Sequence, residues 1–318
     1  MKFSNYITEQ QDLQEKLILL SNGKKYGQIC FLAGGAGSGK GFAAANFMEK
    51  EKFKVRDVDE WKKTLLKMAN VVKTPEKFDK GDIGPDKYAE IKGLDLTKPN
   101  DVFKLHKFVD AMGIKDKTLD LMLNNLHKKE VLPNILFDIT AKNINDIAKF
   151  MPRLLKAGYN PANIHLVWVL TNYQVSLKNN LDPSRGRIVP EDIMFTSHGG
   201  AAQTMVDMIQ GTGKKIQLNG QIHVILNNRE NTVYFSDPSG KKKERISSIT
   251  GKKNSDVIKD FKYLTLKKRG KGMETQKSVQ KQIYKWIVDN IPTGDLLKAL
   301  VDRGAKVGKS KARNKEVF

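Results

Sequence analysis

Cysteine is the scarcest residue type in this sequence, with Cys30 as its only example among 318 residues. A single cysteine excludes an intrachain disulfide and any metal site built from several thiolates. Because Cys30 lies in an apolar segment, we interpret it as a small core residue. The five histidines show no metal-ligand spacing, and His165, in an apolar segment, is interpreted as a core or edge residue. The sequence therefore assigns no metal ligand.

Long apolar runs are also missing. No stretch of about 18 apolar residues occurs, and the first residues do not show the pattern of a signal peptide. We therefore expect no membrane span, no export through Sec, and a soluble protein located in a cytoplasm. With 318 residues and 39% hydrophobic content, the chain can bury a sizeable core, as one large domain with additions or as two domains.

Acidic residues are few relative to basic ones, with 35 Asp and Glu against 56 Lys and Arg and a formal charge of +21. The excess is uneven, since residues 241–318 contain 22 Lys and Arg against 8 Asp and Glu, a net charge of +14. Such a field attracts polyanions, of which nucleic acid is the commonest in a cell. We therefore expect non-specific DNA binding through the basic C-terminal region. A lysine-rich surface that serves solubility alone is the alternative.

A glycine-rich loop directly follows the apolar segment 29–33, which we predict to be a strand. Its spacing fits G-x-x-x-x-G-K, in which successive backbone N–H groups wrap a polyphosphate and the lysine reaches the outer phosphates. Residues 41–48 are predicted to form a helix whose positive N-terminal end faces the anion. The order of strand, loop and helix favours phosphate binding over a purely structural turn. The residues assigned to nucleotide binding are Gly34, Gly35, Ala36, Gly37, Ser38, Gly39, Lys40 and Gly41.

Gly41 stands where most P-loops have a Ser or Thr whose hydroxyl binds magnesium. Direct magnesium ligation from this position is therefore impossible. The loop resembles that of adenylate kinases and their relatives, which also have glycine there, except that Ala36 replaces a proline. The substitution weakens the case for a magnesium ligand in the loop and leaves nucleotide binding in place.

Strand-then-helix units repeat along the chain. The predicted strands cover residues 29–33, 53–56, 134–138 and 164–170. The third is followed by a predicted helix over 144–157 that ends at Gly158. This alternation predicts an α/β fold, a P-loop kinase-type parallel sheet with helices on both faces, in which ligands bind beyond the carboxyl ends of the strands. The loop, Asp57, Asp59 and Asp138 would all lie at that edge.

The remaining segments set the predicted domain organisation. Residues 1–20 are expected to form an N-terminal helix or targeting segment, residues 21–237 the P-loop domain, and residues 238–318 a basic, mainly helical C-terminal region. Within the P-loop domain, residues 74–132 read as a helical insertion, and residues 221–227 and 232–235 as a hairpin or edge pair. The other predictions are insertion helices around 100–111 and 116–128, C-terminal helices over 274–290 and 294–303, and a flexible basic tail over 306–315.

Phosphoryl transfer needs a phosphate cradle, cations that neutralise the transferred group, and a carboxylate that accepts the proton of the nucleophile. Lys40 supplies one cation, and Arg185 and Arg187 follow a helix after the fourth strand, where a mobile lid could bring them onto the phosphates. Asp57 and Asp59 are both candidates for the base, because a one-residue slip at the strand end exchanges their directions. The structural alternatives are a solvated turn for the arginines and helix N-capping for the aspartates.

The order of these motifs resembles the zeta-toxin family of P-loop kinases over residues 27–200. That family has a P-loop, an Asp-x-Asp at a strand end, an acid with a nearby threonine, a Gly-Tyr and lid arginines. The corresponding segments here are Asp57-Val58-Asp59, Asp138-Ile139-Thr140, Gly158-Tyr159 and Ser184-Arg185-Gly186-Arg187-Ile188-Val189-Pro190. The resemblance implies that Lys40 binds the β- and γ-phosphates and that Asp59 is the general base. It also implies that Arg185 and Arg187 are lid cations.

The same resemblance implies that Asp57, Asp138 and Thr140 face the acceptor. Members of the family transfer the γ-phosphate of ATP or GTP, with Mg²⁺, to a hydroxyl, in the best-known cases on a UDP-linked amino sugar. We do not carry that substrate over, because the insertion and the basic C-terminal region depart from the short toxins. The expected acceptor is a hydroxyl on a sugar nucleotide, a nucleoside or a nucleic-acid end.

Two other kinase groups share parts of the plan. Polynucleotide 5′-kinases have the P-loop, the aspartate and the lid arginines, and the basic C-terminal region would suit their substrate. A nucleoside monophosphate kinase is a further alternative, which Lys40-Gly41 favours. This alternative is disfavoured by the segment Phe137-Asp138-Ile139-Thr140, which lacks the Asp-Gly-Phe-Pro-Arg character typical of those enzymes.

The segment Met1–Glu9 resembles the capsid-targeting peptides of internal head proteins in T-even-type phages, which are cut after an apolar-x-Glu sequence. Ile7-Thr8-Glu9 fits that pattern, and Leu13-Gln14-Glu15 is a second fit. An ordinary N-terminal helix is the alternative. The resemblance implies a protein packaged in a phage head and delivered to the host cytoplasm. It also leaves open a DNA-binding internal head protein whose P-loop binds nucleotide without catalysis.

Overall fold

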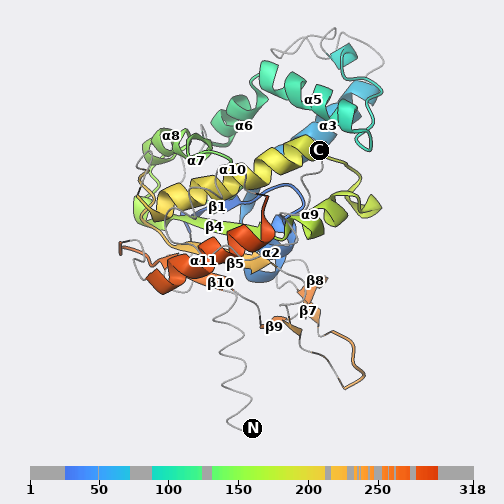
Figure 1. Cartoon of the computed structure of the whole chain (residues 1–318). Coiled ribbons are helices and arrows are strands. Elements are labelled where there is room, and N and C mark those ends of the chain that lie inside the picture. The colour runs from blue at the N-terminus through green and yellow to red at the C-terminus, as the bar shows by residue number, and fades with distance from the viewer. Residues whose placement is uncertain are drawn as a thin grey trace.

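The computed structural model describes most of the chain between residues 26 and 292 (Figure 1). The described ranges are 26–48, 50–71, 88–123, 131–211, 216–227, 233–234, 236, 238–242, 244–246, 253–256, 258–260, 263–272 and 277–292, apart from single positions within them whose side chains are not described. The predictions for residues 1–20, 294–303 and 306–315, including the targeting segment, lie outside these ranges.

A six-stranded sheet of order β10-β5-β4-β1-β3-β2 forms the centre of the molecule. Its strands are β1 (Ile29–Ala33), β2 (Lys54–Asp57), β3 (Ile135–Ile139), β4 (Ile164–Thr171), β5 (Ile222–Asn227) and β10 (Tyr263–Lys267). Strands β1 to β5 pair in parallel, and β10 pairs antiparallel to β5. This confirms the predicted α/β class, and the four strands predicted from apolar runs are confirmed to within one or two residues.

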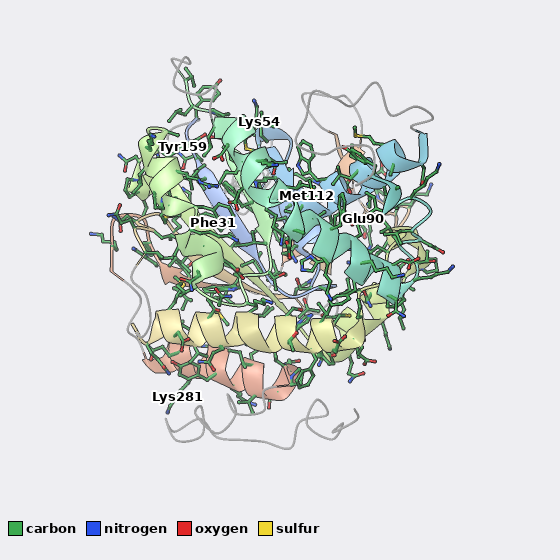
Figure 2. The ribbon with its side chains drawn as sticks, turned by 90° about the horizontal axis from the view of Figure 1, so that it is seen from above. Phe31, Lys54, Glu90, Met112, Tyr159 and Lys281 are labelled. Atoms are coloured by element: carbon green, nitrogen blue, oxygen red, sulfur yellow. The ribbon has the colours of Figure 1, made fainter. Side chains whose placement is uncertain are left out.

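Alternate side chains of the central strand enter two different layers of core, because successive residues of a strand point to opposite faces. Cys30 and Leu32 of β1 pack with Phe47 of α2 (Lys40–Phe47). Ile29 and Phe31 pack on the other face, in the larger cluster. That cluster includes side chains of α6 (Ile114–Leu123), α7 (Asn145–Ala148), α8 (Met151–Lys156), α10 (Glu191–Ile209) and α11 (Lys277–Asn290). Figure 2 shows α10 and α11 side by side. Helices therefore cover both faces, as predicted.

The single helix predicted over 144–157 is wrong, because the segment forms the two short helices α7 and α8. Pro152 lies in the first turn of α8 and has no N–H to donate to a carbonyl of the preceding turn, so a continuous helix would lose a hydrogen bond there. The predicted end is confirmed, since Gly158 has φ 96°, which glycine adopts without strain.

A third apolar cluster lies apart from the sheet, between α3 (Val58–Val71), the segment 88–96 and α5 (Pro99–Ala111). Leu65, Ile91 and Leu105 are among its buried members. Figure 1 shows α3, α5 and α6 together at one end of the molecule. Both helices predicted within the insertion are confirmed where the structure describes them, and they share this apolar cluster with α3.

The predicted hairpin of residues 221–227 and 232–235 is wrong. Strand β5 lies between β4 and β10, while β6 (Val233–Tyr234) pairs with β9 (Ile258–Asp260). The reason is burial: nearly every residue of β5 is buried, so this strand needs partners on both sides.

Strands also occur in the basic C-terminal region, besides the helix predicted over 274–290, which α11 confirms. They are β7 (Glu244–Ile246), β8 (Lys253–Asp256), β9 and β10. Leu266 of β10 and Ile283 and Ile287 of α11 belong to the main core, so this region completes the same sheet that carries the glycine-rich loop. The domain boundary at residue 237 stays a prediction. None of the described helices combines the length and the hydrophobicity of a membrane span.

Candidate functional site

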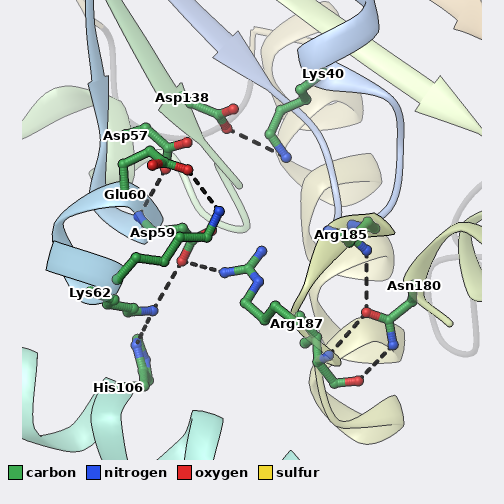
Figure 3. Close-up of polar contacts among 12 residues, drawn as sticks. Lys40, Asp57, Asp59, Glu60, Lys62, His106, Asp138, Asn180, Arg185 and Arg187 are labelled. Atoms are coloured by element: carbon green, nitrogen blue, oxygen red, sulfur yellow. Dashed lines mark hydrogen bonds and ion pairs between the residues drawn. The ribbon is translucent and has the colours of Figure 1, made fainter. Parts of the chain in front are cut away.

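The candidate site lies at the carboxyl ends of the parallel strands, where such sheets bind their ligands. The glycine-rich loop joins β1 to α2, and Asp57 and Asp138 lie on adjacent strands in register with each other. Asp59 follows in the first turn of α3. The structure therefore brings together the loop and all three carboxylates that the sequence placed at this edge (Figure 3).

Two glycines of the loop are required by their backbone conformation and by close contacts. Gly37 has φ 73°, and a Cβ there would lie 2.4 Å from the carbonyl oxygen of Ser176. Gly39 has φ 86°, and a Cβ there would lie 2.3 Å from Nδ2 of Asn227. L-residues rarely adopt these φ values, so neither position accepts a side chain without strain. The glycine spacing is thus a structural requirement of this loop.

The carbonyl groups of five consecutive loop residues, 34–38, all accept hydrogen bonds from side chains. The donors are Lys40 Nζ for Gly34 and Gly35 (2.8 and 3.2 Å), His198 Nε2 for Ala36 (2.7 Å), Asn179 Nδ2 for Gly37 (2.8 Å), and Asn227 Nδ2 (2.8 Å) and Thr171 Oγ1 for Ser38. Within the described ranges, the N–H groups of Ala36, Gly37, Gly39 and Lys40 have no backbone acceptor. A loop with bound carbonyls and unbound N–H groups is suited to an anion.

Lys40 folds back over this loop. Besides its two carbonyl contacts, its Nζ lies 3.6 Å from Oδ1 of Asp138 (Figure 3). Burial raises the pKa of Asp138, Lys40 lowers it, and the neighbouring Asp57 and Asp59 raise it further, with a net increase. Asp138 is therefore a half-buried carboxylate with one close cation.

Asp57 and Asp59 play different roles. Oδ1 of Asp57 accepts the N–H of Asp59 at 2.8 Å, so the N-capping alternative is confirmed for Asp57. Asp59 forms ion pairs with Arg187 and with Lys62, whose Nζ lies 3.2 Å from Oδ1. Burial raises the pKa of Asp59, but these two cations outweigh it and hold the pKa well below its usual value.

The segment 183–190, which we call the lid, contains both predicted arginines, but the two side chains have different partners. It follows α9 (Tyr173–Asn180) and begins with the 3₁₀ helix η4 (Pro183–Arg185). Arg187 extends to Asp59 and is largely buried, so the solvated-turn alternative is wrong for it. Arg185 instead lies against the end of α9, with Nη1 3.3 Å from Oδ1 of Asn180. Of the two arginines, it is Arg187 that meets the carboxylates (Figure 3).

The lid also contacts the helical insertion. The N–H of Ile188 donates to the carbonyl of Leu96 at 3.0 Å. On the same side, Nζ of Lys62 lies 3.5 Å from Nδ1 of His106 on α5 (Figure 3). Asp59 therefore lies where α3, the lid and the insertion meet. The backbone carbonyl of Thr140 accepts a hydrogen bond from the N–H of Gly34 at 3.3 Å. That the side chain of Thr140 faces the acceptor stays a prediction.

Several residues of the site were missed by the sequence analysis. Thr171, Asn179, His198 and Asn227 lie between 133 and 189 positions from the loop residues that they contact. They belong to no motif, and only the pairing of β4 and β5 with the rest of the sheet brings them there. Lys62 carried a weak signal, since it lies one helical turn after Asp59.

Magnesium would be bound at this edge by few protein ligands. Gly41 offers no side-chain oxygen, and the described ranges contain no cluster of three or more His, Cys, Asp or Glu able to hold a metal. Mg²⁺ usually takes one or two carboxylates and completes its shell with water and phosphate oxygens. Asp138, with Asp57 beside it in register, fits that requirement.

Comparisons with known proteins give structural neighbours only. No family model and no curated protein matches the chain. A protein of the PezAT chromosomal toxin-antitoxin system of Streptococcus pneumoniae is 13% identical, with 72% of this chain and 80% of that chain covered and a TM-score of 0.39. The AvrRxo1-ORF1:AvrRxo1-ORF2 structure with sulphate ions is 13% identical, with 99% and 88% covered and a TM-score of 0.42. The corresponding structure with ATP is 12% identical, with 97% and 86% covered and a TM-score of 0.42. At these TM-scores the similarities carry no argument about activity, ligands or partners.

Proposed function

We propose that the protein is a P-loop phosphotransferase that moves the γ-phosphate of ATP or GTP to a hydroxyl group of an acceptor. One observation carries the proposal: a loop with unbound N–H groups lies at one sheet edge with Lys40, Asp138, and the Asp59–Arg187 pair. These are the cradle, the cations and the carboxylates that phosphoryl transfer requires. The order of motifs that resembles the zeta-toxin family supports the same reaction class.

The loop geometry supports nucleotide binding. The unbound N–H groups of Ala36, Gly37 and Gly39 would donate to the phosphate oxygens, at the positive end of α2. Lys40, which holds two loop carbonyls, would exchange them for the β- and γ-phosphates, which are stronger acceptors for an ammonium group. Asp138, with Asp57 nearby, would hold a Mg²⁺ ion, which would neutralise charge on the phosphates.

Arg187 is the proposed second cation. Its guanidinium group already lies at the carboxylate edge, paired with Asp59. A phosphate offers it two oxygens in the geometry that guanidinium groups prefer, so a bound γ-phosphate competes with Asp59 for Arg187. Arg185, bound to the end of α9, is the weaker candidate in this arrangement.

Asp59 is the proposed base, in preference to Asp57, whose carboxylate caps α3. While Arg187 pairs with Asp59, the low pKa makes this carboxylate a poor proton acceptor. Transfer of Arg187 to the γ-phosphate removes that charge and raises the pKa. The acceptor oxygen then bonds to the γ-phosphorus as the bond to the β–γ bridging oxygen breaks, and the hydroxyl proton passes to Asp59.

The test is transfer of labelled γ-phosphate from ATP and GTP to separate pools of UDP-sugars, nucleosides, nucleoside monophosphates, and 5′-hydroxyl DNA or RNA. Label in one pool establishes the reaction and names the acceptor class. Lys40→Ala should lower transfer by about a hundredfold or more, as loss of a key electrostatic group does in other enzymes. Lys50→Ala, which removes an exposed lysine, is the matched control and should change nothing.

Two observations favour a second function, nucleotide binding without catalysis. The proposed base is held by two cations, and Gly41 has no hydroxyl for magnesium. A protein that binds nucleotide without catalysis would act as a nucleotide switch, for example as a DNA-associated internal head protein of a phage. Nucleotide binding that depends on Lys40, with no label transferred to any pool, would support it over the phosphotransferase.

A further inference from the structure

The side chains that bond the carbonyls of Ala36, Gly37 and Ser38 come from one part of the molecule. Thr171 ends β4, Asn179 lies in α9, His198 in α10, and Asn227 ends β5. All four follow the loop by more than 130 positions and contact it from the β4–β5 half of the sheet. Side chains from four separate elements therefore hold one short stretch of backbone.

A bound carbonyl also orients the next N–H group. The trans peptide is planar, so the C=O of one residue and the N–H of the next point in opposite directions. A donor that holds the carbonyl of Ala36 away from the site therefore turns the N–H of Gly37 toward it. The contact at Ala36 is made by His198, whose Nε2 lies 2.7 Å from the oxygen.

The surroundings of His198 are fitted to this contact. The residue is 3% exposed, and its ring packs edge-on against Tyr173, with the ring centroids 5.5 Å apart. A Cβ built on Gly35 would lie 2.3 Å from the ring. Because the imidazole occupies the space of a missing side chain, Gly35 and His198 are complementary in shape.

The protonation state of His198 is also defined. A carbonyl oxygen can only accept, so Nε2 carries the proton of this hydrogen bond. Burial lowers the pKa of His198 to about 4, Lys40 contributes in the same direction, and the bond to Ala36 opposes them. At neutral pH the ring is therefore a neutral donor, which adds no charge that would compete with Lys40 for phosphate.

We propose that His198 is a positioning residue of the phosphate loop, which holds the Ala36 carbonyl so that the N–H groups of the empty loop already point at the phosphate position. Asn227 and Thr171 do the same for the N–H of Gly39, because both donate to the carbonyl of Ser38. Asn179 holds the carbonyl of Gly37 and so fixes the same stretch of backbone, while the N–H of Ser38 donates to the carbonyl of Gly35. The expected consequence is a higher affinity for the triphosphate, and this consequence rests on the proposed nucleotide binding. Such preorganisation raises affinity, because the free-energy cost of ordering the loop is not subtracted from the binding free energy.

The decisive comparison is between two variants of equal length, His198→Gln and His198→Met. The amide nitrogen of Gln can replace Nε2 as donor, whereas Met fills the space without a donor. His165→Gln and His165→Met are the matched controls. His165 is equally buried but lies at the other end of β4, where it bonds Gln28 and the N–H of Gln221.

Dissociation constants for ATP and for inorganic tripolyphosphate, without magnesium, are the first readout. We expect His198→Met to bind both about tenfold more weakly than His198→Gln, as loss of one buried hydrogen bond predicts. His198→Gln should stay within about threefold of wild type. The two His165 variants should match each other in affinity. Asn179→Leu, which frees the carbonyl of Gly37, should also weaken both ligands if His198→Met does not fold.

Hydrogen exchange of the nucleotide-free protein is the second readout, and it does not depend on the proposed function. The amides of Ser38 and Ala43 bond to the carbonyls of Gly35 and Gly39 only while the loop keeps this conformation. They should exchange faster in His198→Met than in His198→Gln. Equal exchange and equal affinity in the two His198 variants would overturn the inference. A loss of affinity in His165→Met as large as that in His198→Met would also overturn it. Wild-type protein that binds neither ligand would refute the proposed function, while the exchange result would still decide the inference.

Discussion

At the scale of single residues, two buried histidines make the fold sensitive to mild acid. Burial lowers the pKa of His165 to about 3 and that of His198 to about 4. Below about pH 6.5 the unfolded chain binds a proton at each position that the folded protein does not bind. We therefore expect the free energy of unfolding to decrease as the pH falls from about 6.5 to about 4, by up to ~1.4 kcal/mol per pH unit for each histidine.

Urea unfolding at pH 7, 6 and 5 measures this dependence. The double variant His165→Gln, His198→Gln should show a flatter dependence than wild type, because glutamine does not titrate. An equal slope in the two proteins would contradict the assignment.

Gly41 permits a second prediction at the residue scale. Nothing lies within 4 Å of a Cβ built there, in contrast to Gly39. Gly41→Ser should therefore fold normally and place a hydroxyl where most P-loops bind magnesium. We expect Mg²⁺ to strengthen ATP binding on the order of fivefold more in Gly41→Ser than in wild type, equivalent to ~1 kcal/mol.

Titration of ATP with and without Mg²⁺ gives the comparison. Gly39→Ala is the contrasting variant and should lose affinity in both conditions, since its φ of 86° and the contact with Asn227 exclude a side chain. An equal magnesium effect in Gly41→Ser and wild type would place the ion elsewhere.

At the scale of elements, the lid and the helical insertion should open together. Arg187 pairs with Asp59 of α3, and the N–H of Ile188 bonds to the carbonyl of Leu96 in the insertion. Asp59→Asn weakens the first contact, so we expect the amide of Ile188 to exchange about tenfold faster. Asp57→Asn is the control, because asparagine caps a helix as well as aspartate does. Unchanged exchange in Asp59→Asn would show that the two contacts are independent.

The elements that the sequence predicted are those with a local pattern. Strands β1 and β4 are apolar runs because both of their faces are buried, and Gly158 ends α8 through its own backbone conformation. The partner of β5 was predicted wrongly, because pairing with a strand some 40 positions away leaves no local pattern. The break between α7 and α8 was detectable, since Pro152 interrupts the hydrogen bonding.

The residues of the candidate site also differ in whether a local sequence pattern predicts them. The loop, Asp57 and Asp138 were predicted from a motif and from strand ends, which are properties of short segments. The contact between His198 and Ala36 spans 162 positions, and that between Asn227 and Ser38 spans 189. Neither residue type is unusual in its own segment, so only the assembled sheet reveals these contacts.

At the scale of the whole molecule, the net charge of +21 predicts an affinity for DNA that depends strongly on salt. Residues 306–318, outside the described ranges, contain five Lys or Arg and one Glu. Deleting them should weaken DNA binding and reduce the slope of log K against log salt by ~0.9 for each DNA phosphate that these residues neutralise. Lys40→Ala should leave DNA binding intact while it lowers phosphate transfer by about a hundredfold or more. Loss of both properties in either variant would contradict separate roles.

The antiparallel strand β10 has a consequence for synthesis of the chain. It covers the outer edge of β5, yet Asn227, the last residue of β5, and Tyr263 are 36 positions apart. At about 5–20 residues per second, the ribosome needs about 2–7 s to make the residues between them. Until β10 is made, β5 presents an uncovered strand edge, which is a template for pairing with other chains. The nascent protein therefore passes through an aggregation-prone stage that ends only when its last sheet strand leaves the ribosome.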